Sequence, residues 1–177
     1  MSDEGKLRVF FALMPSYAES VALSAWQARF GEVCGGRRMR VDTLHTTLVF
    51  MGNIERHLLE ALKLAAQQVK ARSFDLVFDA ANYWPHNHIV YASPKVVPPQ
   101  LTGLVHDLEH NLAYHHIQFD KRKYQPHVTL LRNAQWEETV IPAMDPTIWQ
   151  VRNFVLLHSM PSANGANYKT LASFGLH

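Results

Sequence analysis

The chain has 177 residues, of which 47% are hydrophobic and 18% charged, a balance that can bury a core and does not suit a disordered protein. Its formal net charge of +2 argues against a protein that coats nucleic acid through bulk electrostatics. No apolar run approaches the roughly 20 residues of a membrane-spanning helix, no secretory signal is visible, and a single cysteine, Cys34, excludes an internal disulfide. We expect a cytoplasmic, monomeric protein with no membrane segment and no obligate protein partner.

The first half of the chain reads as a strand, a helix, a basic loop and a second strand. Residues 7–14 form an apolar run rich in strand-forming residues. Ser16 and Glu19 have the spacing of a capping box, and apolar residues continue from there at helical intervals. The glycine-rich, basic segment GGRRMR (35–40) then leads into a predicted strand over 44–51, which a second helix follows.

The second half repeats this order of elements. Alternating apolar and polar residues predict a strand over 74–84, and residues 88–93 read as a further strand. Leucines at helical spacing over 101–112 predict a helix, and a basic loop leads to a strand over 127–131. Two closing strands are expected near 151–158 and 168–174.

Each copy of this order ends in the same letters, histidine, any residue, threonine and leucine. The histidine follows the proline that ends the leading strand by a similar number of residues in both copies. We interpret this as an internal duplication within a single domain, 1–177, with repeats at 7–72 and 73–150 and closing strands at 151–177.

The paired motifs, LHTTL (44–48) and PHVTL (126–130), place chemistry at equivalent points of the two repeats. Residues i and i+2 of a strand share a face, so His45 lies beside Thr47, and His127 beside Thr129. One such tripeptide is weak evidence, because a lone histidine in a strand is more often structural. Two of them, related by a pseudo-two-fold axis, would converge on one cleft.

Such a cleft suits a phosphodiester. Hydrolysis needs a base for water and an acid for the leaving oxygen on the opposite side of phosphorus, and histidine, with a pKa near 6.5, can serve as either. The threonine hydroxyls would donate to the non-bridging oxygens, so the scheme requires no metal. Arg132 lies on the opposite strand face by strict alternation and would reach the phosphate only if the strand ends or bulges.

Short basic runs precede both motifs. The first contains Arg37, Arg38 and Arg40, and the second contains Lys121, Arg122 and Lys123. Basic runs are usually solvated loops, but their matched placement favours contacts to RNA, for which we single out Arg122 and Lys123.

Taken together, these features resemble the 2H phosphoesterases, and within them the bacterial RNA 2',3'-cyclic phosphodiesterases, also called 2'-5' RNA ligases. The similarity runs through most of the chain, in the segments LRVFFALMP, LHTTLVFMGN, WPHNHIVYAS, YQPHVTLLRNA and FVLLHSMPSANGANYKTLASFGL. It implies an α+β fold of two pseudo-symmetric lobes, each an antiparallel sheet with helices on its outer face, and an active-site cleft between them.

The resemblance also implies a reaction, in which a terminal 2',3'-cyclic phosphate is hydrolysed to a 2'-phosphomonoester without a cofactor. It makes His45 the proton donor, His127 the proton acceptor, and Thr47 and Thr129 phosphate ligands. Its substrates would be RNA ends, such as those of tRNA fragments, or cyclic nucleotides, with 2'-5' ligation as a minor reverse reaction. Thr46 departs from the family, which often has an apolar residue there.

Two other readings remain open. The cleft could bind an RNA end without hydrolysing it, with Phe10, Phe11 or Trp84 stacking on a base. Of these three, we expect Phe11 to make the contact. The segment HDLEH also fits a zinc peptidase pattern through His106 and His110. The leucine stripe of this helix defines its buried face and leaves His106 on the solvent-exposed face, which favours an ordinary surface helix.

Overall fold

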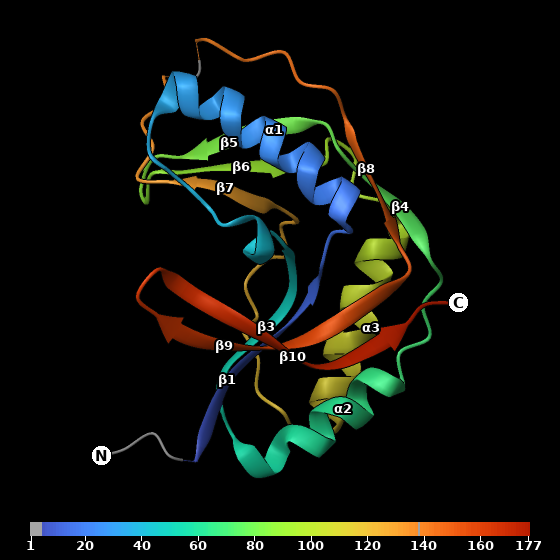
Figure 1. Ribbon diagram of the computed structural model, residues 1–177. Coiled ribbons are helices and arrows are strands. Elements are labelled where there is room, and N and C mark those ends of the chain that lie inside the picture. The colour runs from blue at the N-terminus through green and yellow to red at the C-terminus, as the bar shows by residue number, and fades with distance from the viewer. Residues whose placement is uncertain (1–4, 138) are drawn as a thin grey trace.

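Two four-stranded antiparallel sheets lie one above the other in the computed structural model, which describes residues 5–137 and 139–177 (Figure 1). The first sheet has the strand order β10-β9-β1-β3 and consists of β1 (Lys6–Leu13), β3 (Thr46–Glu55), β9 (Asn153–Ser162) and β10 (Gly165–Gly175). The second has the order β2-β7-β6-β5 and consists of β2 (Arg37–Arg38), β5 (Ala80–Trp84), β6 (Ile89–Ser93) and β7 (Val128–Arg132). A two-stranded ribbon pairs β4 (Phe74–Phe78) with β8 (Thr147–Val151).

The protein has the helices α1 (Tyr17–Cys34), α2 (Leu59–Gln67) and α3 (Pro99–Tyr114) in the described part of the chain, and they pack on the sheets (Figure 1). Helix α1 follows a strand of the first sheet but packs on β7 of the second, while α3 follows a strand of the second sheet and contacts β3 of the first and α2. The expected α+β fold of two antiparallel sheets with outer helices is confirmed. No helix in the described part of the chain combines the length and apolarity needed to cross a bilayer.

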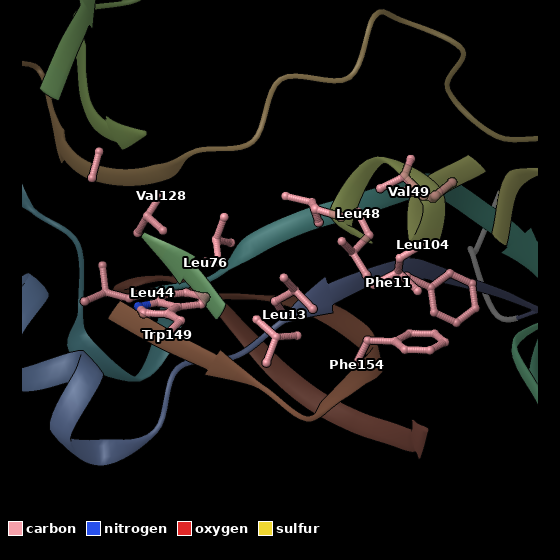
Figure 2. Close-up of a cluster of buried hydrophobic side chains, with 14 of the residues drawn as sticks. Phe11, Leu13, Leu44, Leu48, Val49, Leu76, Leu104, Val128, Trp149 and Phe154 are labelled. Carbon is pink, nitrogen blue, oxygen red and sulfur yellow. The ribbon is translucent and has the colours of Figure 1, made fainter. Parts of the chain in front are cut away.

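One hydrophobic core includes residues of both sheets and of the helices α1, α2 and α3. Figure 2 shows Phe11 of β1, Leu104 of α3 and Trp149 of β8 among its buried side chains. At about 1.5–3 kcal/mol for each fully buried large apolar side chain, this shared core makes separate unfolding of one sheet costly. The two sheets are therefore held in a fixed relation.

The local sequence signals at the start of α1 are confirmed. The Ser16 side chain accepts a hydrogen bond from the Glu19 main-chain nitrogen (3.3 Å), and the Glu19 carboxylate accepts one from the Ser16 nitrogen (2.9 Å). These reciprocal bonds satisfy two of the donors that every helix start leaves unpaired. The other Glu19 oxygen accepts from the Gln150 nitrogen (3.0 Å), which ties the helix start to β8.

The prediction of one strand over 74–84 is wrong. Its first part pairs with β8 and its second part with β6, so the chain changes partners at Asp79. The Asp79 nitrogen donates to the Ser93 carbonyl (3.3 Å), and its carboxylate accepts from the Lys95 nitrogen (2.8 Å). Strand β8 was also not anticipated, although Thr147, Trp149 and Val151 alternate with exposed residues as a half-buried strand requires.

Gly36 lies where the chain that leads into β2 closely approaches the end of β7. Its φ is +84°, and a Cβ there would lie 2.6 Å from the Arg132 carbonyl oxygen and 3.0 Å from main-chain atoms of Ala134. We expect Gly36→Ala to lower the free energy of unfolding by about 2 kcal/mol or more in urea denaturation. Gly103→Ala is the control, because nothing lies within 4 Å of a Cβ there, and it should stabilise α3 by up to about 1 kcal/mol. Equal stability of the two variants would contradict the close approach of β2 to β7.

Candidate active site

The two HxT motifs occupy equivalent positions at the starts of two strands. His45 is the residue before β3 in the first sheet, and His127 is the residue before β7 in the second. Each threonine lies two residues further on and is half-buried, as each histidine is. Thr47 and His127 line the same cavity, so the two motifs meet between the sheets.

A hydrogen bond to the main chain fixes the orientation of each imidazole. The Nδ1–H of His45 donates to the Thr43 carbonyl oxygen (2.7 Å), and the Nδ1–H of His127 donates to the Gln125 carbonyl oxygen (2.8 Å). A carbonyl oxygen can only accept, so Nδ1 carries the proton in both neutral rings and Nε2 is the basic nitrogen. In neutral His45, Nε2 accepts a hydrogen bond from the Thr47 hydroxyl (3.1 Å).

The surroundings lower the pKa of both histidines. Burial lowers the pKa of His45 below its ordinary value of 6.5, the hydrogen bond to Thr43 opposes this, and the positive charges of His127 and Arg132 lower it further. Burial also lowers the pKa of His127, against the effect of its bond to Gln125. His127 and Arg132 therefore lie close enough to His45 for their positive charges to lower its pKa.

Aromatic side chains pack against each imidazole. The His45 ring centroid lies 5.2 Å from that of Phe10 and 5.2 Å from that of Tyr168. The His127 ring lies 4.8 Å from Trp84 and 5.6 Å from Tyr91, which contact each other at 4.0 Å. These rings restrict both imidazoles and remove water around them, which is the physical source of the lowered pKa values.

A bulge at the fourth residue of each motif turns the side chain two residues further on toward the cleft. In β7, Thr129 pairs with Tyr91 and Leu131 with Val90, so Leu130 is an extra residue. Alternation shifts by one position there, so Leu130 and Leu131 are both fully buried and Arg132 returns to the face of Thr129. Arg132 was expected in the cleft only if the strand bulged, and the bulge is present.

Strand β3 contains the matching bulge. Thr47 pairs with Ala12 and Val49 with Phe11, which makes Leu48 the extra residue. The cleft position that Arg132 occupies in the second sheet therefore belongs to Phe50 in the first, and the Arg8 guanidinium lies 4.8 Å from the centre of its ring. The two halves thus offer different side chains at equivalent points.

A cavity of about 460 Å³ opens beside His127 and has a volume suited to a small ligand. Its lining includes three aromatic residues, two basic residues and two acidic ones, namely Phe50, Trp84, Tyr124, Arg122, Lys123, Glu109 and Asp120. Arg122 donates from Nε to the Asp120 carboxylate (2.7 Å), so part of its charge is neutralised. The predicted RNA contacts Arg122 and Lys123 therefore lie at this cavity.

The prediction that Phe11 contacts RNA is wrong. Phe11 is fully buried, and its ring centroid lies 6.0 Å from that of Phe154 and 6.2 Å from that of Phe174. Figure 2 shows Phe11 and Phe154 among the buried side chains. Because side chains alternate along a strand, Phe10 lies on the opposite face of β1 from Phe11 and contacts His45. Sequence reasoning also missed Tyr168, for which the alternating pattern of β10 offered no distinguishing signal.

The histidines of the HDLEH segment do not line the cavity that Thr47 and His127 share. His106 and His110 are exposed on α3, as the leucine stripe predicted. Between them, the partly buried Glu109 lines the 460 Å³ cavity. Within residues 5–137 and 139–177, no three His, Cys, Asp or Glu side chains gather as metal ligands would.

Comparison with known proteins gives relatives along nearly the whole chain. The model of the 2'-5' RNA ligase superfamily matches residues 16–159. The RNA 2',3'-cyclic phosphodiesterase of Escherichia coli strain K12 is 28% identical over 170 residues, which is 96% of each protein. Crystal structures of E. coli LigT, 28% identical, match with TM-scores of 0.85 in the apo form and 0.86 in complex with 3'-AMP, each covering 97% of this chain and 98% of that chain. TT0787 of Thermus thermophilus, 20% identical, shares the fold with a TM-score of 0.77 over 96% of this chain and 98% of that chain.

The position of Arg132 predicts how His45 titrates. Replacing Arg132 by Gln removes a positive charge that faces His45, so the pKa of His45 should rise. The measurement is an NMR titration of the His45 ring protons in the wild-type protein and in Arg132→Gln. Arg72→Gln, an exposed arginine after α2, is the matched control and should leave the titration unchanged. An unchanged pKa in Arg132→Gln would mean that the guanidinium lies outside the cleft.

Proposed function

Because the chain belongs to the 2'-5' RNA ligase superfamily, within the 2H phosphoesterases, we propose that it opens the 2',3'-cyclic phosphate at an RNA end to give a 2'-phosphomonoester. The observation that carries the proposal is the meeting of Thr47 and His127 in one cavity, with both imidazoles held by the same type of main-chain bond. The E. coli relative named for this activity and the LigT complex with 3'-AMP support an RNA or nucleotide substrate.

The proposed reaction is an in-line displacement at phosphorus. Water attacks from the side of His127, whose Nε2 takes its proton, and a new P–O bond forms. The bond from phosphorus to the ribose 3' oxygen breaks on the other side, and the Nε2–H of protonated His45 gives its proton to that oxygen. Proton exchange with solvent then restores both histidines, so no metal or cofactor enters the reaction.

The negative charge that the phosphate carries through the transition state needs donors fixed beforehand. In this scheme Thr47 and Thr129 donate to the non-bridging oxygens, and Arg132 adds a bidentate, charged contact. The bulge at Leu130 supports this role because it turns Arg132 to the face of Thr129. Arg132 also lowers the pKa of His45, which makes the protonated ring a better donor.

The reverse reaction would join a 5'-hydroxyl to the 2' position through the same residues. Water is present at far higher concentration than an RNA hydroxyl and wins unless the second strand is held in place. Hydrolysis is therefore the proposed main activity and ligation a side reaction.

Removing the acid or the base should abolish most of the activity. His45→Ala and His127→Ala should each reduce kcat for a cyclic-phosphate RNA end at least about 10²-fold, because each removes one proton transfer. The product is identified by chromatography as the 2'- or 3'-monoester. Full activity in either variant would contradict acid-base catalysis and favour a non-catalytic RNA-end or nucleotide-binding protein.

Thr46, the residue before Thr47, provides a control for removal of the Thr47 and Thr129 hydroxyls. Thr47→Val and Thr129→Val should lower kcat on the order of 10-fold to 10³-fold, the cost of losing a transition-state donor. Thr46→Val makes the same change at a buried hydroxyl that has no hydrogen-bond partner among the described residues, and it should retain wild-type kcat. Equal rates in all three valine variants would mean that the hydroxyls serve packing alone.

The pH dependence follows from the two lowered pKa values. The reaction needs neutral His127 and protonated His45, so the profile of kcat/KM is a bell. Both pKa values lie below 6.5 in the free protein, so activity persists in mild acid and falls as His45 loses its proton, with an optimum below about pH 6.5. Bound phosphate is negative and raises the pKa of His45, so the alkaline limb of kcat should lie at higher pH than that of kcat/KM. EDTA should change neither profile; a requirement for added divalent metal would contradict the scheme.

A further inference from the structure

A second cavity opens on the His45 side of the cleft. It has a volume of about 250 Å³, and two of the residues that contact His45, Thr43 and Tyr168, line it. Its polar lining also includes Asn164 and three arginines, namely Arg37, Arg40 and Arg132. Arg40 is anchored to the β9–β10 hairpin, because its Nη2 donates to the Ala166 carbonyl (3.1 Å) and to Asn167 Oδ1 (2.8 Å).

A third cavity continues from the second along this hairpin, which projects at the left of Figure 1. Its volume is about 720 Å³, and it shares Gly165 and Ala166 with the second cavity. Lys6 and Arg8 line it together with His158. Exposed Lys6 and Arg8 alternate with buried Leu7, so β1 turns both cations outward.

Charge distinguishes this continuous surface from the cavity beside His127. In the cavity beside His127, the acids Glu109 and Asp120 oppose Arg122 and Lys123. Among the described residues that line the second and third cavities, none is acidic. Carboxylates outside the lining pair with Arg40 (Asp42, 3.1 Å) and Lys6 (Glu55, 3.7 Å). No salt-bridge partner engages Arg8, Arg37 or Arg132 within the described part of the chain.

The direction of the proposed reaction selects the same side. The leaving 3' oxygen stays bonded to the ribose, so the terminal nucleoside lies on the side of the proton donor, His45. The rest of the RNA joins that ribose through its 5' phosphate and must leave the cleft on this side too. Each following phosphate adds a charge that arginine and lysine can neutralise with release of counterions.

We propose that the RNA body 5' of the cyclic phosphate runs from His45 through the cavity of Arg37, Arg40 and Arg132, and over Gly165–Ala166 to Arg8 and Lys6. The inference rests on the proposed function and on His45 as the donor. It makes the protein an enzyme that prefers oligonucleotides to mononucleotides, and it leaves the cavity beside His127 to the attacking water.

The test compares two substrates, adenosine 2',3'-cyclic phosphate and a short single-stranded oligonucleotide with the same cyclic end. The wild-type protein should prefer the oligonucleotide in kcat/KM, and Arg37→Ala and Arg8→Ala should each reduce that preference about 10-fold. A variant that neutralises one phosphate fewer should show a slope of log kcat/KM for the oligonucleotide against log salt that is shallower by about 0.7. Arg72→Ala, beside the C-terminal end of the chain, is the control and should keep the wild-type preference and slope.

Binding of a fluorescein-labelled oligonucleotide with a 2'-phosphate end, measured by anisotropy, separates this inference from the proposed function. Weaker binding in Arg37→Ala and Arg8→Ala supports the RNA path even if neither substrate is hydrolysed, an outcome that would overturn only the function. Equal use of both substrates by the wild-type protein would overturn the path while leaving the function intact. A preference or affinity that disappears in Lys123→Ala but is kept in Arg37→Ala and Arg8→Ala would place the RNA body beside His127 and also overturn the path.

Discussion

A hydrogen bond from each cleft histidine to a main-chain carbonyl two residues earlier is the constraint on which the rest of the site depends. The bonds of His45 to Thr43 and of His127 to Gln125 put the ring proton on Nδ1 and leave Nε2 as the basic nitrogen. Both are local, because the chain makes them within two residues of the imidazole. Each HxT segment therefore orients its own imidazole, and the fold has only to bring the two segments together.

The two halves are held together because α1 and α3 each pack on the sheet opposite to the one whose strand precedes them. Helix α1 covers β7 and α3 contacts β3, so a single core lies behind both walls of the cleft. Burial and aromatic neighbours then remove water from both imidazoles and lower their pKa values. The same packing that stabilises the protein thus tunes its titrating groups.

The two halves of the cleft contribute different side chains at equivalent positions. Matching bulges bring Phe50 into the cleft from one sheet and Arg132 from the other. The surface beside His45 is basic, whereas the cavity beside His127 balances acids against bases. The proposed displacement at phosphorus also has two unequal sides, since its leaving oxygen would belong to a polyanion and its nucleophile would be water. This asymmetry fits the reaction better than a symmetric cleft would.

The sequence alone determined the repeated order of elements, the capping box of α1, the two HxT pairs and the family, because each depends on spacing within a short segment or on a pattern repeated along the chain. Only the tertiary structure decided which residues join those pairs. Alternation defines two faces of β1 but not which one the core covers, so Phe10 and not Phe11 meets His45. The bulge that admits Arg132 is an extra residue relative to β6, and Tyr168 arrives from the far end of the chain. The register between neighbouring strands decides such contacts, and this register cannot be read from the sequence of one strand alone.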